Sequence, residues 1–300
     1  MSLRDFGLLF LICFIWGVNL VMTRWVVSDF SVPPLFFAAI RFLGVAVFLI
    51  PFLRPVPKNL ATLFLIAMLI GCLNFGLLFI GLANADVSAA AVTGQLGVPI
   101  STLMSMVFLG EHIRWRRGLG IALAFAGVVV IAFDPNSFTL SYGLMLIFFA
   151  AVLGSAGGIV MKRMPPMDAL NLQAWVGLFS FAPLFAMSGL METGQIEAYV
   201  AGGWEVWLAS LFAVLGVSIF AHSAFYTLVK RHDVSLLSPL TLMTPLWGVV
   251  FGVTLLGEPF TWKLVIGGAV SLAGVFLIAI RPNSVLPDAS LGKKLASGDS

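Results

Sequence analysis

The sequence predicts an all-α integral membrane protein with ten transmembrane helices, arranged as two inverted five-helix repeats with both termini in the cytoplasm. Three observations support this fold class. Hydrophobic residues make up 60% of the 300-residue chain and charged residues 10%, whereas a soluble domain is nearer half apolar and a quarter charged. Ten apolar stretches follow one another with short breaks, and the second half of the chain repeats the first.

A transmembrane helix needs roughly 20 apolar residues. The ten stretches expected to span are 5–27, 33–53, 60–81, 86–109, 115–134, 142–162, 169–190, 204–229, 234–256 and 262–281. Pro, Gly, Asn and Asp punctuate most of the breaks between them, as expected of loops. A longer break near 191–204 carries Glu192, Glu197 and three glycines, and no stretch indicates a separate soluble domain.

The two repeats are expected over residues 1–137 and 138–284, followed by a disordered cytoplasmic tail over 285–300. The first stretch is interpreted as a helix rather than a signal peptide, because no small-residue cleavage site follows its apolar run. Cys13 and Cys72 lie inside apolar stretches. We expect them to be buried small hydrophobic residues rather than a disulfide or a metal pair, and we expect no metal ion or cofactor.

Loop charge predicts the orientation, because cytoplasmic loops carry an excess of Lys and Arg. Only Arg24 and Lys263 lie in segments that would then face outward, and Arg41 lies within a helix. The thirteen basic residues expected inside are Arg4, Arg54, Lys58, Arg114, Arg116, Arg117, Lys162, Arg163, Lys230, Arg231, Arg281, Lys293 and Lys294. Basic residues spread in this way over loops do not indicate a nucleic-acid partner.

The two halves align at an offset of 147 residues. Asp86-Val87-Ser88 meets Asp233-Val234-Ser235, and Leu-Gly-Glu followed by Trp occurs at 109–115 and again at 256–262. Shared lipid-facing composition would match Leu and Val at random, but not Asp, Glu and Trp in register. Five helices is an odd number, so the second repeat must enter the membrane inverted. Inverted repeats are typical of transporters with a substrate site near the midplane.

Several motifs occur together in one order. They are Trp16-Gly17 with Asn19, Arg41-Phe42 after Pro33-Pro34, and in each half a long fourth helix that ends in Gly-Glu before a Gly-rich fifth helix. Through these motifs, residues 5–281 resemble the EamA-type branch of the drug/metabolite transporter superfamily, and within it the bacterial amino-acid exporters. The resemblance implies ten helices, a central cavity and export of small metabolites across the bacterial inner membrane.

The repeated Gly-Glu pair is expected to end one helix and begin the next. Gly110 and Gly257 suit a helix C-terminus. Glu111 and Glu258 then stand just before the next helix, where a carboxylate satisfies free backbone N–H groups and the helix dipole. The aspartates that precede the fourth and ninth helices are expected to be N-caps in the same way: Asp86 and Asp233.

One face of the eighth helix carries Ser218, His222 and Tyr226 at every fourth residue. Polar groups in the hydrocarbon region are costly and need a reason, so a cavity-lining role competes with a packing hydrogen bond for His222. The corresponding face of the third helix carries Gly71, Phe75 and Phe79. Because the repeats are inverted, we expect Phe79 near the outer mouth and Tyr226 near the inner mouth, as opposing gates.

Arg41 is expected about 12 Å below the outer surface, from its place eight residues into the second helix. It can meet a substrate carboxylate or bond backbone carbonyls at a helix crossing. Pro99 and Pro245 either free carbonyls for a cavity or only kink their helices. The residues expected to line the substrate cavity are Trp16, Asn19, Arg41, Asn74, Phe75, Phe79, Gln95, Pro99, Trp175, His222, Tyr226, Thr241, Pro245 and Trp247.

Glycines at matching places in the fifth and tenth helices indicate close helix contacts. These contacts lie either inside one chain or in a homodimer, so both a monomer and a homodimer are compatible with the sequence. The residues are Gly120, Gly127, Gly267 and Gly274.

The features together favour a secondary transporter that exports amino acids or related small amphiphilic metabolites. An ammonium group can rest on aromatic faces, and His222 is the mid-membrane group that can titrate near neutral pH. No Asp or Glu is expected deep in a span, so the usual carboxylate proton relay is missing, and gradient-driven flux is favoured over tight proton coupling. Carriers of other metabolites or of cationic drugs, and channel-like proteins, are the alternatives. An enzyme is not expected, because the sequence has no HExxH motif, no apparent Ser-His pair and no buried aspartate dyad.

Overall fold

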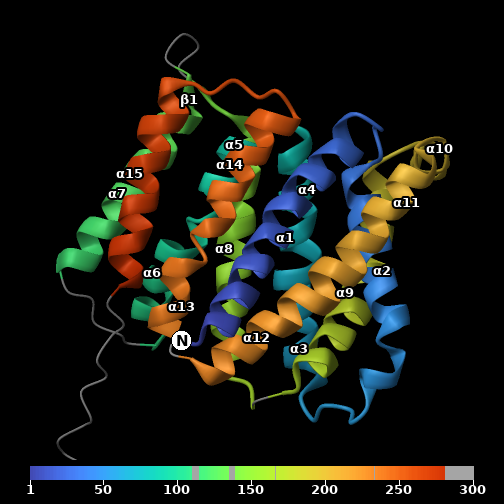
Figure 1. The fold of residues 1–300 in the computed structure, drawn as a ribbon. Helices are drawn as coiled ribbons and strands as arrows, with labels where there is room; N and C mark the ends of the chain where they lie inside the picture. Colours follow the sequence, from blue (N-terminus) through green and yellow to red (C-terminus); the bar gives the residue numbers. More distant parts are fainter. Residues whose placement is uncertain (110–114, 135–138, 166, 233, 281–300) are drawn as a thin grey trace, which may run out of the picture.

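The computed structural model describes residues 1–109, 115–134, 139–165, 167–232 and 234–280. The described part consists of helices joined by loops, together with one small hairpin. In this hairpin β1 (Phe133–Asp134) pairs antiparallel with β2 (Thr139–Leu140). Figure 1 shows the helices packed side by side, with the start of α1 and the end of α15 at the same end of the molecule.

Helices occupy all ten stretches that the sequence predicts. The first half contains α1 (Leu3–Ser28), α2 (Pro34–Phe48), the 3₁₀ turn η1 (Ile50–Leu53), α3 (Leu60–Ile66), the π-helical η2 (Ala67–Leu73), α4 (Asn74–Ala83), α5 (Val87–Gly94), α6 (Gly97–Leu109) and α7 (Trp115–Ala132). The second half contains α8 (Tyr142–Lys162), α9 (Ala169–Met191), α10 (Gln195–Ala201), α11 (Gly203–Leu211), the π-helical η3 (Phe212–Ala221), α12 (His222–Arg231), α13 (Val234–Leu240), α14 (Met243–Leu255) and α15 (Trp262–Ala279).

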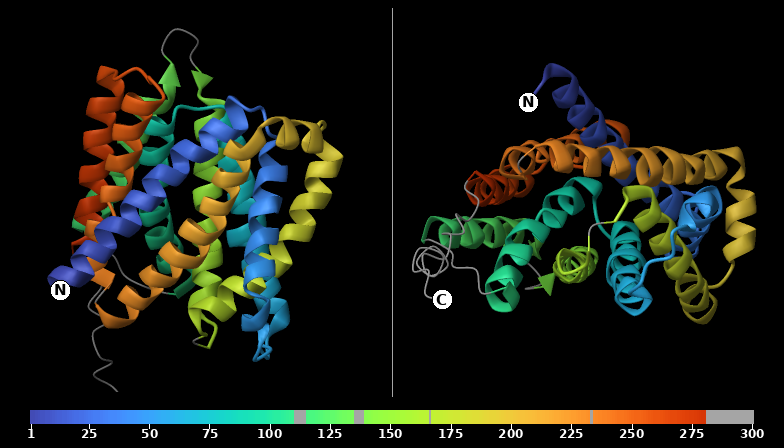
Figure 2. Two further views of the ribbon diagram at one scale, coloured as in Figure 1. Left: turned by 45° about the vertical axis from the view of Figure 1, so that its right-hand side comes forward. Right: turned by 90° about the horizontal axis from the view of Figure 1, so that it is seen from below.

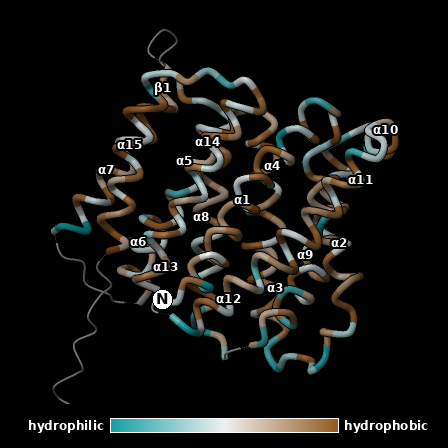
Figure 3. The backbone as a smooth tube through the Cα atoms, in the orientation of Figure 1, coloured by the Kyte–Doolittle hydropathy of each residue, from teal (hydrophilic) through white to brown (hydrophobic). Residues whose placement is uncertain are grey.

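Eight of the described helical stretches are long and apolar enough to cross a membrane, and α2 and α14 are shorter apolar helices of 15 and 13 residues. Figure 3 shows hydrophilic residues gathered at the two ends of the bundle and hydrophobic residues between them. Large apolar side chains such as Val107 and Leu190 are exposed on its outside. Apolar surface of this extent is stable against lipid and not against water. The chain is therefore a multi-pass integral membrane protein.

Prolines explain where several helices are interrupted. A proline at position i removes the hydrogen bond to the carbonyl of residue i−4. Pro99 cannot donate to the carbonyl of Gln95, which accepts from Val98 N at 3.1 Å instead, and α5 and α6 are separated at residues 95–96. Pro245 cannot donate to the carbonyl of Thr241, which accepts from Thr244 N at 3.0 Å instead, and α13 and α14 are separated at residues 241–242. Near Pro51 a helix is interrupted as well: α2 ends at Phe48, three residues before this proline.

The glycine faces of α7 and α15 pack against each other within the chain, as Figures 1 and 2 show. A Cβ atom added to Gly120 would lie 2.8 Å from the carbonyl oxygen of Gly274. A Cβ atom on Gly127 would collide with the backbone of Gly267 and Ser271. Of the two contacts that the sequence left open, the structure has the internal one.

Candidate functional site

A buried polar group lies where α2 packs against η3, the helical segment that continues into α12. Arg41 is 1% exposed, and its Nε donates a hydrogen bond of 3.0 Å to Ser218 Oγ. Ser218 in turn donates to the Ala213 carbonyl at 3.0 Å. His222 follows Ser218 by one helical turn on the same face, and its side chain is half-buried. The side chains of Arg41, Ser218 and His222 form what we call the polar core.

The tautomer of His222 follows from its hydrogen bond. Its Nδ1 lies 2.9 Å from the Val217 carbonyl oxygen. A carbonyl oxygen can only accept, so Nδ1 carries the proton and Nε2 of the neutral ring is an acceptor. The imidazole ring lies 5.6 Å from the Trp16 ring of α1, centroid to centroid, and Trp16 also contacts Phe225 at 5.2 Å. The polar core is therefore bounded by α1 on this side.

Phenylalanines cover the other side of the polar core. The guanidinium carbon of Arg41 lies 4.6 Å from the centroid of the Phe75 ring, within the range of a cation–π contact. Phe75 contacts Phe42 at 5.3 Å and Phe79 at 5.9 Å, and Phe79 is stacked on Phe37 at 5.6 Å. Phe79 is fully buried. Rings from α2 and α4 thus separate Arg41 from the end of the molecule where α4 ends.

Two donors of this region are buried without a partner among the described residues. They are Arg41 Nη1 and Trp16 Nε1. Both are N–H groups, which can only donate. A buried polar group without a hydrogen bond carries a desolvation cost. Each of these two N–H groups therefore lacks an acceptor among the described residues.

Glu192 fixes the helix that carries Arg41. Its carboxylate accepts hydrogen bonds from the backbone N–H groups of Leu35, at 2.8 Å, and Phe36, at 3.0 Å. Ser188 Oγ donates to the same carboxylate at 2.7 Å. A carboxylate at a helix N-terminus satisfies free N–H groups and the helix dipole. Although Glu192 follows α9 in the sequence, it thus caps α2.

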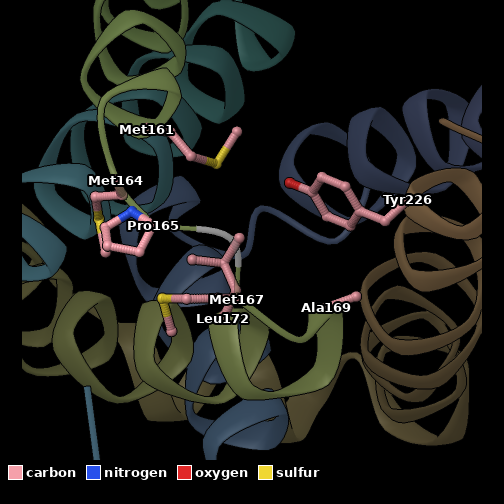
Figure 4. Close-up of a pocket in the computed structure, with 7 residues that line it drawn as sticks. All are labelled: Met161, Met164, Pro165, Met167, Ala169, Leu172 and Tyr226. Carbon is pink, nitrogen blue, oxygen red and sulfur yellow. The ribbon is translucent and has the colours of Figure 1, made fainter. Parts of the chain in front are cut away.

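A pocket of about 160 Å³ opens where α12 passes the end of α8 and the start of α9. Figure 4 shows Tyr226 directed from α12 across this pocket toward Met161. Three methionines supply half of its other lining, which consists of Met161, Met164, Pro165, Met167, Ala169 and Leu172. Tyr226 therefore lies toward the end of the bundle that carries the α8–α9 connection, whereas α4, which carries Phe79, ends at the opposite end of the bundle (Figure 1).

At that opposite end Glu258 joins the two halves of the chain. Its carboxylate accepts hydrogen bonds from the backbone N–H groups of Val87 and Ser88, and from Ser88 Oγ. We call these contacts the Glu258 clasp. The prediction that Glu258 caps the following helix is therefore wrong: Thr261 Oγ1 caps α15 by accepting from Leu264 N at 3.2 Å. Glu258 instead caps α5, whose N-terminus comes to the end of α14 only through the fold.

The neighbouring helix-end predictions have mixed outcomes. Gly257 has φ of +67° directly after α14, so the predicted glycine terminus is confirmed. Asp86 occupies the N-cap position of α5, but its side chain makes no capping hydrogen bond. Partial loss of hydration and the nearby Glu258 carboxylate hold the pKa of Asp86 above its usual value. The residues at the corresponding positions of the other repeat lie outside the described residues: Gly110, Glu111 and Asp233.

The other predicted cavity residues lie in several places. The Nδ2 group of Asn74 donates to the Ala150 carbonyl of α8 at 2.6 Å, and Asn19 is buried in α1. Trp175 contacts Phe179 within α9, and its Nε1 is buried without a described partner. Trp247 packs against Phe10, Phe14 and Phe251, beside α1. The remaining four lie around the two helix interruptions. Gln95 and Thr241 lie in the breaks, and Pro99 and Pro245 lie in the first turns of α6 and α14.

Phe37 and Phe42 are the site residues that sequence reasoning missed. Both flank Arg41 on α2, and their aromatic contacts reach α4. Phe42 belongs to the Arg41-Phe42 motif, which was the available signal. Within the part of the chain that the structure describes, no group of three His, Cys, Asp or Glu residues could hold a metal ion, and Cys13 and Cys72 are buried free thiols.

Comparison with known proteins gives matches over nearly the whole chain. The EamA-like transporter family matches residues 6–133 and again residues 139–280. A relative from Escherichia coli K12 described as "Probable amino-acid metabolite efflux pump" is 27% identical over 294 residues, with 92% of this chain and 95% of the relative covered. A second, from Salmonella typhimurium LT2, has the same description and is 25% identical, covering 92% and 95%.

Two further similarities differ in kind. The "Uncharacterized inner membrane transporter YedA" of Escherichia coli K12 is 26% identical over 264 residues, covering 84% of this chain and 83% of the relative. One solved crystal structure has a TM-score of 0.63 at 20% sequence identity, covering 99% of this chain and all of that chain, so it shares the fold. With its family matched twice along its length, this membrane protein belongs to the EamA-like transporter family.

Proposed function

We propose that this protein is a secondary transporter that exports amino acids or related small amphiphilic metabolites across the bacterial inner membrane by alternating access. The observation that carries the proposal is the polar core, in which the buried Arg41 and Ser218 and the half-buried His222 contact aromatic rings within apolar helices. Buried polar groups at membrane depth mark substrate pathways more often than they serve packing. Two relatives described as probable amino-acid metabolite efflux pumps support the substrate class.

We propose ten spans in two inverted repeats, residues 1–137 and 138–284, with residues 285–300 and both termini in the cytoplasm. Several pairs of elements support this arrangement. The limits of α7 and α15 differ by 147 residues, and so do the starts of α5 and α13. The π-helical segments η2 and η3 and the two proline interruptions also lie at corresponding places. The family matches each half separately.

In this proposal the substrate binds at the polar core and the two ends of the bundle open in turn. The Phe75 and Phe79 rings close the path at the outer end, and Tyr226 with the methionines of its pocket closes it at the inner end. Aromatic faces suit both an apolar side chain and an ammonium group. The substrate therefore needs no carboxylate from the protein to hold its positive charge.

A gradient of the substrate is proposed to drive export without obligatory proton transfer. Proton-coupled carriers commonly use Asp, Glu or His in mid-membrane. In the spans that the structure describes, the polar core contains His222 as its titratable residue besides Arg41. The Nδ1 proton of His222 is committed to the Val217 carbonyl. A transport rate that stays constant when a pH gradient is collapsed would support export that the substrate gradient alone drives.

The test is uptake into proteoliposomes containing the purified full-length chain, with a panel of labelled amino acids, nucleosides and organic cations. We expect saturable uptake of one or more amino acids, together with counterflow when the unlabelled compound is preloaded. Uptake of organic cations alone would replace the proposed substrate class. High flux that never saturates and shows no counterflow would identify a channel instead.

A further inference from the structure

We infer that Arg41 binds the carboxylate of the transported molecule, so that a carboxylate is the part of the substrate this carrier requires. The inference rests on the proposed function and narrows its substrate class. Three observations carry it: Arg41 is 1% exposed, its Nη1 has no described partner, and its described hydrogen bond goes to a neutral hydroxyl.

The cost of burying Arg41 requires an explanation. A charge removed from water is stabilised inside a protein only by an opposite charge or by a full set of hydrogen bonds. Ser218 supplies one neutral acceptor, and Phe75 supplies the negative face of its ring. These contacts leave Nη1 unsatisfied. A carboxylate fits the fork of N–H groups on a guanidinium by geometry as well as by charge.

Other arginines of this chain show what a purely structural role is like. The Nη1 of Arg24 donates to the Leu82 carbonyl at 2.7 Å, and the Nη2 of Arg163 donates to the Phe108 carbonyl at 2.8 Å. Each of these two side chains joins two helices through a backbone acceptor. Arg41, the most deeply buried of the three, has no such described contact. Bonding of carbonyls at a helix crossing, the structural alternative for Arg41, therefore describes Arg24 instead.

The surroundings of Arg41 fit the remainder of an amino-acid-like molecule. Trp16, whose Nε1 is the second donor without a described partner, has its ring 5.6 Å from that of His222 and can serve another acceptor of the ligand. Phe75 lies against the guanidinium and offers an apolar face to a side chain. A bound carboxylate also neutralises Arg41. The loaded site therefore carries less net charge than the empty one while the two repeats of the protein move around it.

The experiment compares amino acids with their amides, which lack only the carboxylate charge. Six unlabelled competitors are tested against the best labelled substrate in uptake by the parent protein. Three are the amino acids phenylalanine, leucine and tryptophan, and three are their amides, phenylalaninamide, leucinamide and tryptophanamide. A charged hydrogen bond in a buried site corresponds to roughly tenfold or more in affinity. We therefore expect each acid to compete at least about ten times better than its amide in the parent.

Three variants assign this difference to Arg41. Arg41→Gln and Arg41→Met should reduce the acid-to-amide ratio to near one, and Arg41→Lys should retain part of it because the charge remains. Arg24→Gln is the matched control, since it removes an arginine that bonds a carbonyl, and it should leave the ratio unchanged. Amides that compete as well as acids in the parent, or a ratio that Arg41→Gln does not alter, would overturn the inference.

Thermal unfolding of the purified protein separates this inference from the proposed function. Without substrate, Arg41→Met should unfold at a temperature equal to or above that of the parent, because a buried unpaired charge is gone. Phenylalanine and 3-phenylpropionate should raise the unfolding temperature of the parent and not of Arg41→Met. If neither raises it in the parent, Arg41 is not a carboxylate site. If both do while no amino acid is transported, the inference stands and the proposed export fails.

Discussion

At the scale of single residues, the proposed transport function depends on a few polar side chains that apolar helices enclose. Arg41 on α2 meets Ser218, which is 177 residues away in the chain. The sequence predicts a polar face on the eighth helix from the spacing of Ser218 and His222, because periodicity is a local property. It cannot predict that Arg41 meets Ser218, because that contact depends on how α2 packs against η3.

His222 gives a test at the residue scale. If it lines the substrate path, His222→Ala should reduce the rate of uptake severalfold while the amount of folded protein in the membrane stays the same. The physical reason is the loss of the imidazole ring through which the polar core contacts Trp16. Size-exclusion profiles and uptake rates would be measured together.

A second variant distinguishes proton transfer from shape. His222→Gln keeps a side chain that can donate to the Val217 carbonyl but cannot take up a proton. We expect it to transport with the pH dependence of the parent, as a carrier without obligatory proton coupling should. A flattened pH profile in this variant would show that His222 carries the proton, and undiminished uptake by His222→Ala would return the residue to a packing role.

At the scale of helices, local sequence signals were enough to place most elements, and the contacts between them were not. Apolar runs and prolines put helices in all ten expected stretches. The short helix α10 and the β1–β2 hairpin were not expected, because each forms inside a segment that reads as a polar break. The partner of Glu258 was predicted wrongly for a similar reason: a free helix N-terminus does not have to belong to the next helix in the chain.

The contact between α7 and α15 gives a prediction about stability. Gly127→Ala places a methyl group against the backbone of Gly267 and Ser271, so we expect a loss of about 1–3 kcal/mol in folding stability. Gly118→Ala is the matched control on the same helix, since nothing lies within 4 Å of its added Cβ atom. There the change should be neutral or slightly stabilising. Thermal unfolding in detergent would compare the two, and equal effects would argue against close packing at Gly127.

The Glu258 clasp gives a prediction about opening at the outer end. It holds the start of α5 to the end of α14 through a charged helix cap. Glu258→Gln should weaken this closure by about 1–2 kcal/mol, a factor of roughly 5–30 in the population of the outward-open state. Labelling of a cysteine at Gln95 by an impermeant thiol reagent added outside would report it. Glu197→Gln, which removes an exposed carboxylate at the same end, should have no such effect, and slower labelling in Glu258→Gln would contradict the proposed role.

At the scale of the whole molecule, the proposed inverted repeat predicts two closures of different chemistry at opposite ends. Phe79 is fully buried among rings near the end of α4, and Tyr226 lines a methionine-rich pocket near the end of α12. Residues at corresponding positions of the two repeats would thus close opposite mouths of one path. The buried thiols Cys13 and Cys72 are replaced before any labelling. Cysteines at Asn84 should then react from outside and cysteines at Lys58 or Arg163 from inside, while labelling of both groups from one side would contradict the orientation.

Alternating access itself is tested by removing one closure at a time. In Phe79→Ala the stacked contact with Phe37 is lost, so a cysteine at Gln95 should become more reactive toward reagent added outside. In Tyr226→Ala the same cysteine should become more reactive toward reagent added inside, because α12 no longer fills the pocket between α8 and α9. Each variant should favour one direction of access, since opening at one end requires the other end to stay closed. A cysteine that reacts equally from both sides at once, in either variant or in the parent, would indicate a continuous pore and would contradict a transporter that alternates.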